Sequence, residues 1–170
     1  MSELFSIQLQ NRQQQGGDGV WLDLPTTTER VQAALRQIGI SSDNPQGLFI
    51  SGYFAEEEKR FAIPYNMVLA SNVDELNFLA SRLETFSTGE RAELNAALQA
   101  PQSELFSIGR ITDFPENVDY YVHLPDVHGP AQLGDYYLNR SGMVDMPEEW
   151  KGGIDPAQFG RYVAQQEQGV

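Results

Sequence analysis

Near the start of the chain, apolar and polar residues alternate in two short stretches. Residues 5–9 and 20–24 each place an apolar side chain at every second position. A period of two is typical of a half-buried β-strand, and the polar segment 13–19 between the stretches contains glycines that favour a turn. We therefore predict a β-hairpin. Residues 48–50 are also apolar, and we expect them to add a third strand to a small sheet.

A helix is predicted between the hairpin and the third strand. Thr26 and Glu29 have the spacing of a capping box, in which each side chain accepts a hydrogen bond from a backbone N–H of the first turn. Apolar residues then recur with a helical period as far as Ile38. Gly39 follows at the position where a left-handed residue commonly ends a helix.

In the middle of the chain the apolar period changes from two to about 3.6 residues, which is typical of helices. Asn72 with Glu75 predicts the start of one helix, and Ser87 with Glu90 predicts the start of a second, with Pro101 just beyond its end. Two short antiparallel helices bury little apolar surface by themselves. This region must therefore pack against a neighbour.

The last third of the chain shows both kinds of pattern. Residues 120–124 alternate as in a strand, and Pro130 marks the start of a helix that Gly142 can end. Asp155 begins a final helix, in which Phe159, Tyr162 and Val163 are expected to face inward. The fold class predicted is α+β, with small mixed sheets at both ends and a short helical middle.

These patterns divide the chain into three small domains. Residues 1–62 form a ββαβ-like N-terminal domain, residues 63–100 a helical middle domain, and residues 101–170 an α+β C-terminal domain. A chain of 170 residues with 41% apolar residues is long enough to bury a core in such pieces.

The charge of the chain is strongly unbalanced. There are 24 acidic residues against 11 basic ones, which gives a net charge of −13. Solubility requires less than this, and self-repulsion of like charges lowers stability, so the acidity itself is a candidate for the function. Between residues 113 and 149, eight acidic residues and one arginine account for seven of the 13 net charges. Aromatic residues within that stretch indicate that it is folded.

Such acidity limits the possible partners and compartments. Nucleic acid and anionic membranes repel an acidic protein, so basic protein surfaces are the expected partners. The absence of cysteine excludes disulfides and zinc–thiolate sites. No apolar run approaches the roughly 20 residues of a membrane span, and the N-terminal residues do not resemble a signal peptide. We therefore expect a cytoplasmic protein.

Few residues suggest catalysis or metal binding. His123, Asp126 and His128 are possible metal ligands, but their spacing does not place both imidazoles on one helical face, and two loop histidines are the favoured interpretation. The runs 56–58 and 148–149 contain adjacent glutamates, which point in different directions and are more typical of a solvated face. We predict no enzyme activity, no cofactor and no metal.

Several stretches, in order and spacing, resemble one protein family. They are Phe5-Ser6-Ile7-Gln8-Leu9, Val20-Trp21-Leu22-Asp23-Leu24-Pro25-Thr26-Thr27-Thr28, Ile38-Gly39-Ile40, Asp74-Glu75-Leu76-Asn77-Phe78-Leu79-Ala80, Leu133-Gly134-Asp135-Tyr136-Tyr137, Met146-Pro147-Glu148 and Ile154-Asp155-Pro156-Ala157-Gln158-Phe159-Gly160-Arg161. Together they are similar to the ArdA antirestriction proteins over nearly the whole chain. The resemblance implies an elongated, acidic DNA mimic of three small domains, usually dimeric and carried on mobile elements. It also implies that the partner is a type I restriction-modification enzyme.

The carboxylates expected to imitate phosphates lie mainly in the C-terminal stretch and continue across the two middle helices. They are Asp74, Glu75, Glu84, Glu90, Glu93, Asp113, Glu116, Asp119, Asp126, Asp135, Glu148 and Glu149. Some of them, such as Glu75 and Glu90, are also expected to cap helices. The alternative function is an acidic protein-binding module of a mobile element that regulates another DNA-binding protein.

Overall fold

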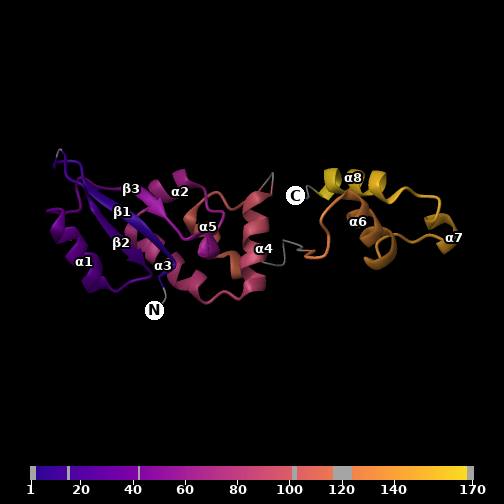
Figure 1. Ribbon diagram of the computed structural model, residues 1–170, viewed down its shortest axis with the longest axis horizontal. Helices are drawn as coiled ribbons and strands as arrows, with labels where there is room; N and C mark the ends of the chain where they lie inside the picture. The colour runs from indigo at the N-terminus through magenta and orange to yellow at the C-terminus, as the bar shows by residue number, and fades with distance from the viewer. Residues whose placement is uncertain (1–2, 15, 42, 101–102, 117–123, 168–170) are drawn as a thin grey trace. The chain divides into compact units, whose positions relative to one another are not determined.

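The computed structural model describes residues 3–14, 16–41, 43–100, 103–116 and 124–167. Its contacts divide the chain into two compact units (Figure 1). Unit 1 comprises Met1–Leu98 with Glu104–Tyr120, and unit 2 comprises Gln99–Ser103 with Tyr121–Val170. The N-terminal sheet and the middle helices thus belong to one unit.

The sheet of unit 1 has three strands, β1 (Phe5–Asn11), β2 (Val20–Leu24) and β3 (Leu48–Phe54), in the order β2-β1-β3. The predicted hairpin is confirmed, with Ile7 opposite Leu22. The sheet is wholly antiparallel, so the prediction of a mixed sheet was wrong: β1 is central, and both neighbours run against it. One face of β1 is buried along its whole length.

Helix α1 (Thr28–Gln37) follows the hairpin, but its N-cap is Thr27 and not the predicted Thr26. The Thr26 backbone is engaged elsewhere, because its N–H donates to Asn77 Oδ1 at 2.7 Å and its carbonyl accepts from Asn77 Nδ2 at 2.9 Å. The other end agrees with the prediction. Gly39 has φ +70°, and the N–H groups of Gly39 and Ile40 donate to the carbonyls of Arg36 and Leu35, which is a Schellman motif.

The other regular elements in the described part of unit 1 are helices joined by loops. They are the 3₁₀ turns η1 (Glu57–Lys59) and η2 (Phe114–Glu116) and the α-helices α2 (Tyr65–Leu69), α3 (Val73–Glu84), α4 (Thr88–Gln99) and α5 (Ile108–Thr112). Asn72 caps α3, and Ser87 and Glu90 form the predicted capping box of α4. The neighbours that the middle helices required are α5 and β2, which both contact α3.

Unit 2 contains α6 (Pro130–Asp135), a π-helical turn η4 (Tyr136–Arg140), α7 (Glu148–Lys151) and α8 (Pro156–Glu167). Pro130 begins α6 as predicted, and Gly142 follows η4 with φ +70°. The predicted strand at 120–124 lies almost wholly outside the described residues. Within 124–167 the unit has helices and loops but no strand.

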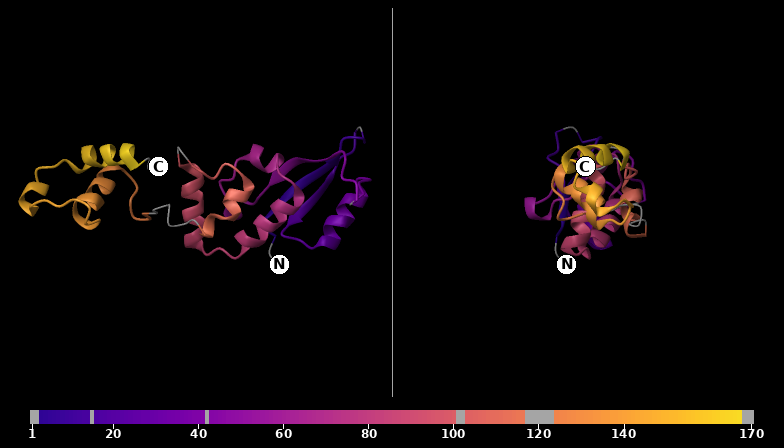
Figure 2. Two further views of the ribbon diagram at one scale, coloured as in Figure 1. Left: turned by 180° about the vertical axis from the view of Figure 1, so that it is seen from behind. Right: turned by 90° about the vertical axis from the view of Figure 1, so that its right-hand side faces the viewer.

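Helices α6 and α8 pack at very short range, side by side in Figures 1 and 2. A Cβ atom at Gly134 would overlap the carbonyl oxygen of Pro156, and one at Gly160 would overlap that of Pro130. The two glycines thus let the two backbones approach each other. On α8, Val163 is buried as expected and Phe159 is half-buried, but Tyr162 is 59% exposed, so the expectation that Tyr162 faces inward was wrong. In the part of the chain that the structure describes, no helix is long and apolar enough to cross a membrane.

Candidate interaction surface

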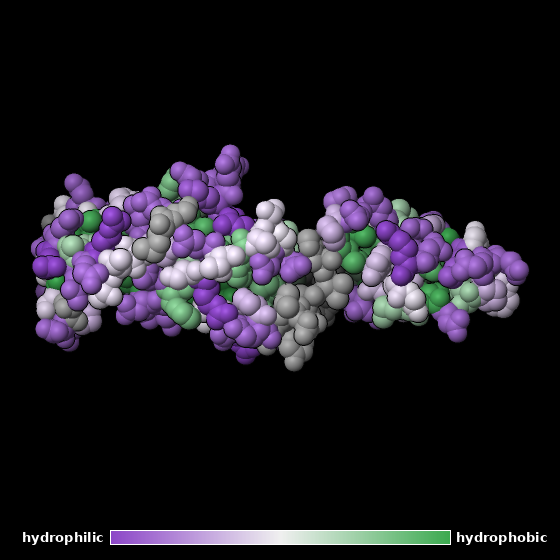
Figure 3. All heavy atoms as spheres, turned by 90° about the horizontal axis from the view of Figure 1, so that it is seen from below, coloured by the Kyte–Doolittle hydropathy of each residue, from purple (hydrophilic) through white to green (hydrophobic). Residues whose placement is uncertain are grey.

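Most of the predicted phosphate-mimicking carboxylates lie on the surface. The exposed residues are Asp74, Glu75, Glu90, Asp113, Glu116, Asp126, Asp135, Glu148 and Glu149. Glu84 and Glu93 are half-buried, and Asp119 lies outside the described residues. On the face drawn in Figure 3, hydrophilic residues predominate over both units, with smaller apolar areas between them. The exposed carboxylates are therefore accessible to a binding partner.

The negative charge is shared by both units. Unit 1 has 17 acidic and eight basic residues, a net charge of −9, and unit 2 has seven acidic and three basic residues, a net charge of −4. The acid-rich stretch 113–149 is divided between the units, with Asp113, Glu116 and Asp119 in the first. The acid-rich stretch of the sequence therefore does not form one acidic domain of its own.

The fold brings two of the predicted carboxylates together on unit 1. Glu75 on α3 and Asp113 at the end of α5 are 38 positions apart in the sequence, yet both line a hollow of about 200 Å³ between these helices. Phe78, which is 58% exposed, lines the same hollow. The hollow therefore combines an aromatic ring with two acidic side chains.

Glu116 forms an ion pair with Arg82, which lies on α3. Arg82 Nη2 donates to Glu116 Oε1 at 2.6 Å. This hydrogen bond is the main reason why the pKa of the Glu116 carboxyl lies below its ordinary value. The pair joins α3 to η2, so Glu116 serves the fold as well as adding to the acidic surface.

In unit 2, two of the predicted carboxylates also have internal partners. Asp135 accepts a hydrogen bond from Asn139 Nδ2 at 2.8 Å and lies 3.9 Å from Arg140 Nε. Lys151 Nζ donates to Glu148 Oε1 at 2.9 Å. Both carboxylates are exposed, so solvent screens the two ion pairs and they contribute little to stability.

Helix capping accounts for other carboxylates, as the sequence indicated. Glu90 accepts a hydrogen bond from the Ser87 N–H at 2.7 Å, and this bond is the first cause of the lowered pKa of Glu90. Asp155 accepts one from the Ala157 N–H at 2.8 Å. By contrast, Asp74, Glu75, Asp126 and Glu149 make no ion pair with another residue in the described ranges. Within the predicted set, these four exposed carboxylates are therefore available to an external cation.

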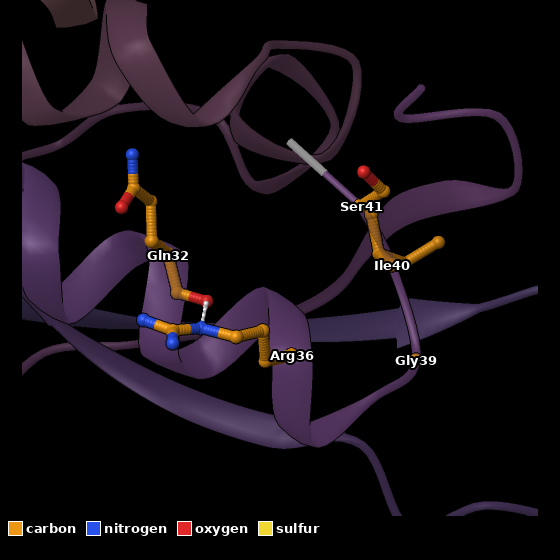
Figure 4. A pocket seen from close by; sticks show the side chains of 5 residues that line it. All are labelled: Gln32, Arg36, Gly39, Ile40 and Ser41. Carbon is orange, nitrogen blue, oxygen red and sulfur yellow. Dashed lines mark hydrogen bonds between the residues drawn. The ribbon is translucent and has the colours of Figure 1, made fainter. Parts of the chain in front are cut away.

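A metal site finds no support in the described part of the chain. No group of three or more histidine, aspartate or glutamate side chains gathers there in a way that could hold an ion. His123 lies outside this part, so the structure does not test the expectation that His123 and His128 are loop histidines and not metal ligands. A larger hollow of about 500 Å³ lies beside α1 and the loop that follows it (Figure 4). Its lining residues, Gln32, Arg36, Gly39, Ile40 and Ser41, include no carboxylate.

Two residues of this surface, Phe78 and Arg82, were not predicted from the sequence. Both lie on the stripe of α3 that begins at Glu75, at helical spacings of three and four residues. From this spacing, the sequence could have predicted that Phe78 and Arg82 lie on the same helix face as Glu75. It could not have shown that α5 and η2 would pack beside this stripe.

The chain matches the model of a known protein family. Residues 16–170 match the family model described as antirestriction protein (ArdA), which covers most of the chain. No curated protein matches closely enough to support a further comparison.

Proposed function

Because this chain belongs to the ArdA family of antirestriction proteins, we propose that it blocks type I restriction-modification enzymes as an acidic mimic of DNA. The family is one of non-catalytic inhibitors, and membership implies an antirestriction function directed at restriction-modification enzymes. The finer proposal is that the protein occupies the DNA-binding groove of its target and offers no base to read and no phosphodiester to cut.

The observation that carries this proposal is the availability of the carboxylates. Asp74 and Glu75 in unit 1, and Asp126 and Glu149 in unit 2, are exposed and make no ion pair with a described residue. A groove that binds DNA presents lysine and arginine side chains to phosphates. Carboxylates accept the same charge-assisted hydrogen bonds from these side chains.

The amount of charge fits a short DNA segment. Duplex DNA carries about two negative charges per base pair, so a net charge of −13 equals that of roughly six or seven base pairs. A homodimer would double this value, to the scale of a bipartite recognition site.

The proposal also includes the homodimer, the cytoplasmic location, the mobile-element origin and the elongated arrangement of domains 1–62, 63–100 and 101–170.

Competition with DNA tests the mechanism directly. Fluorescence anisotropy would follow labelled duplex DNA on a purified type I methyltransferase core while this protein is added. We expect displacement of the DNA, with an affinity that falls steeply as salt is raised, since the contacts are ionic. Simultaneous binding of DNA and protein, or an affinity independent of salt, would contradict mimicry. Simultaneous binding would instead favour the acidic regulatory module.

A set of substitutions tests which carboxylates matter. The variant Asp74→Asn, Glu75→Gln, Asp126→Asn, Glu149→Gln should weaken binding by about tenfold or more, because several exposed ionic contacts are lost together. Any one of these changes should cost about fivefold at most. The matched control is Asp18→Asn, Asp43→Asn, Glu57→Gln, Glu58→Gln, which removes the same charge from exposed positions outside the predicted set. Equal losses in both variants would show that net charge alone determines binding.

A further inference from the structure

Asn77 connects two parts of unit 1 that lie far apart in the sequence. It belongs to α3, and its side chain pairs with the backbone of Thr26, 51 positions earlier, between β2 and α1. Its Oδ1 atom accepts from the Thr26 N–H at 2.7 Å, and its Nδ2 atom donates to the Thr26 carbonyl at 2.9 Å. One side-chain amide thus satisfies both backbone groups of one residue. We call these two hydrogen bonds the Asn77 clamp.

The clamp adds direction to a contact that is otherwise apolar. Helix α3 buries one face through Leu76, Leu79 and Leu83, which are all fully buried. Apolar burial has no preferred direction, whereas a hydrogen bond requires a donor–acceptor distance of about 2.9 Å and a nearly straight angle. The helix also contacts β2, beside which it lies in Figure 1. The clamp therefore sets the register of α3 against the end of this strand.

Two of the predicted phosphate-mimicking carboxylates lie on the same helix, within one turn of Asn77. Asp74 precedes Asn77 by three positions and Glu75 precedes it by two, and both acidic residues are exposed. Neither makes an ion pair with another residue in the described ranges. Their placement relative to the sheet therefore follows that of the helix backbone, which the clamp holds.

We propose that Asn77 is a positioning residue for the antirestriction activity, and that it fixes α3 so that the target's cations reach Asp74 and Glu75 together. This inference rests on the proposed function and deepens it, since it gives an uncharged residue a part in an ionic interaction. A helix held in one position loses no free energy to ordering when it binds. A helix that samples several positions binds with an affinity reduced by the fraction in the competent one.

The test measures binding of the full-length protein to a purified type I methyltransferase core over a series of salt concentrations. Asn77→Ala removes both bonds of the clamp and changes no charge. It should weaken binding about 2- to 10-fold and also reduce the salt dependence, because two carboxylates lose their fixed position together. In NMR, the Thr26 amide proton should exchange faster with solvent, because its acceptor has been removed.

A double-mutant cycle separates positioning from a general loss of stability. In a protein that already carries Asp74→Asn and Glu75→Gln, Asn77→Ala should weaken binding less than about twofold, because the carboxylates that it positions are absent. Asn77→Asp keeps the shape of the side chain and the acceptor for the Thr26 N–H, but removes the donor to the Thr26 carbonyl. It should show the same coupling, and it replaces Asn77→Ala in the cycle if that variant does not fold.

Two control variants leave the clamp in place. Thr26→Val changes the side chain of the residue that Asn77 contacts, but the clamp uses only the Thr26 backbone, and Thr26 Oγ1 is buried with no hydrogen-bond partner in the described part of the chain. Ile7→Val shortens a fully buried side chain of β1 and lowers stability without altering the clamp. Both variants should bind with the affinity and salt dependence of the unmodified protein.

The positioning role would be overturned by unaltered binding of Asn77→Ala, by unchanged exchange of the Thr26 amide, or by an equal loss in either control. Equal losses from Asn77→Ala with and without the two carboxylates would overturn it as well. If the unmodified protein still displaces DNA in any of these cases, the mimicry proposal stands without this role. If the unmodified protein does not displace DNA, the proposed function fails and the role of Asn77 with it.

Discussion

The two units carry their negative charge at almost the same density but are packed in different ways. Unit 1 has nine net negative charges over 115 residues, and unit 2 has four over 55. Unit 1 buries whole leucine and isoleucine side chains from its sheet and from α3, α4 and α5. In the described part of unit 2, the central contact is between two helix backbones at Gly134 and Gly160.

This comparison shows that the acidic surface does not depend on one type of core. A sheet with helices and a glycine-mediated helix pair each present exposed carboxylates at similar density. Evenly spread charge is what a surface needs if it makes many weak ionic contacts. The two cores should nevertheless respond to different substitutions.

The largest effect is expected from shortening a core side chain of unit 1. Leu79 on α3 is fully buried, and Leu79→Ala removes buried apolar surface and leaves a cavity. The free energy of unfolding should fall by about 2–5 kcal/mol. Amide hydrogen exchange by mass spectrometry should show faster exchange in β1 and α3. Equal acceleration in α8 would contradict the independence of the two cores.

Enlarging a glycine of unit 2 should have the next largest effect. Gly134→Ala places a methyl group against the Pro156 carbonyl, so α6 and α8 must separate. We expect a loss of about 1–3 kcal/mol, with faster amide exchange in α6 and α8 and none in β1. Gly152→Ala is the control, because a Cβ there would meet no atom closer than 3.9 Å. Similar losses in both variants would refute the close-approach explanation.

The smallest effect concerns the ion pair between Arg82 and Glu116. Its hydrogen bond lowers the pKa of Glu116, so its contribution to stability is present above the pKa of the unfolded carboxyl and is lost as pH falls through the folded one. In carbon-13 NMR, Glu116 should titrate below the ordinary value of 4.5. Arg82→Gln should raise this pKa towards that value. A pKa that does not respond would disprove the pairing in solution.

The sequence by itself determined the features that depend on a few neighbouring residues. The hairpin, the glycine that ends α1, the caps of α3 and α4, and the proline that begins α6 all follow from local backbone preferences, and the structure confirms them. The excess of acidic residues is likewise a property of composition. Its exposure follows because carboxylates are rarely buried without a partner.

Only the tertiary structure decided which distant residues meet. The Asn77 side chain binds the Thr26 backbone, and the helix cap is at the next residue, Thr27. Packing of α5 on α3 brings Asp113 to Glu75 and Phe78, and two glycines 26 positions apart form one helix contact. Such contacts depend on how apolar faces are buried against each other, and local sequence preferences do not specify that choice of partner.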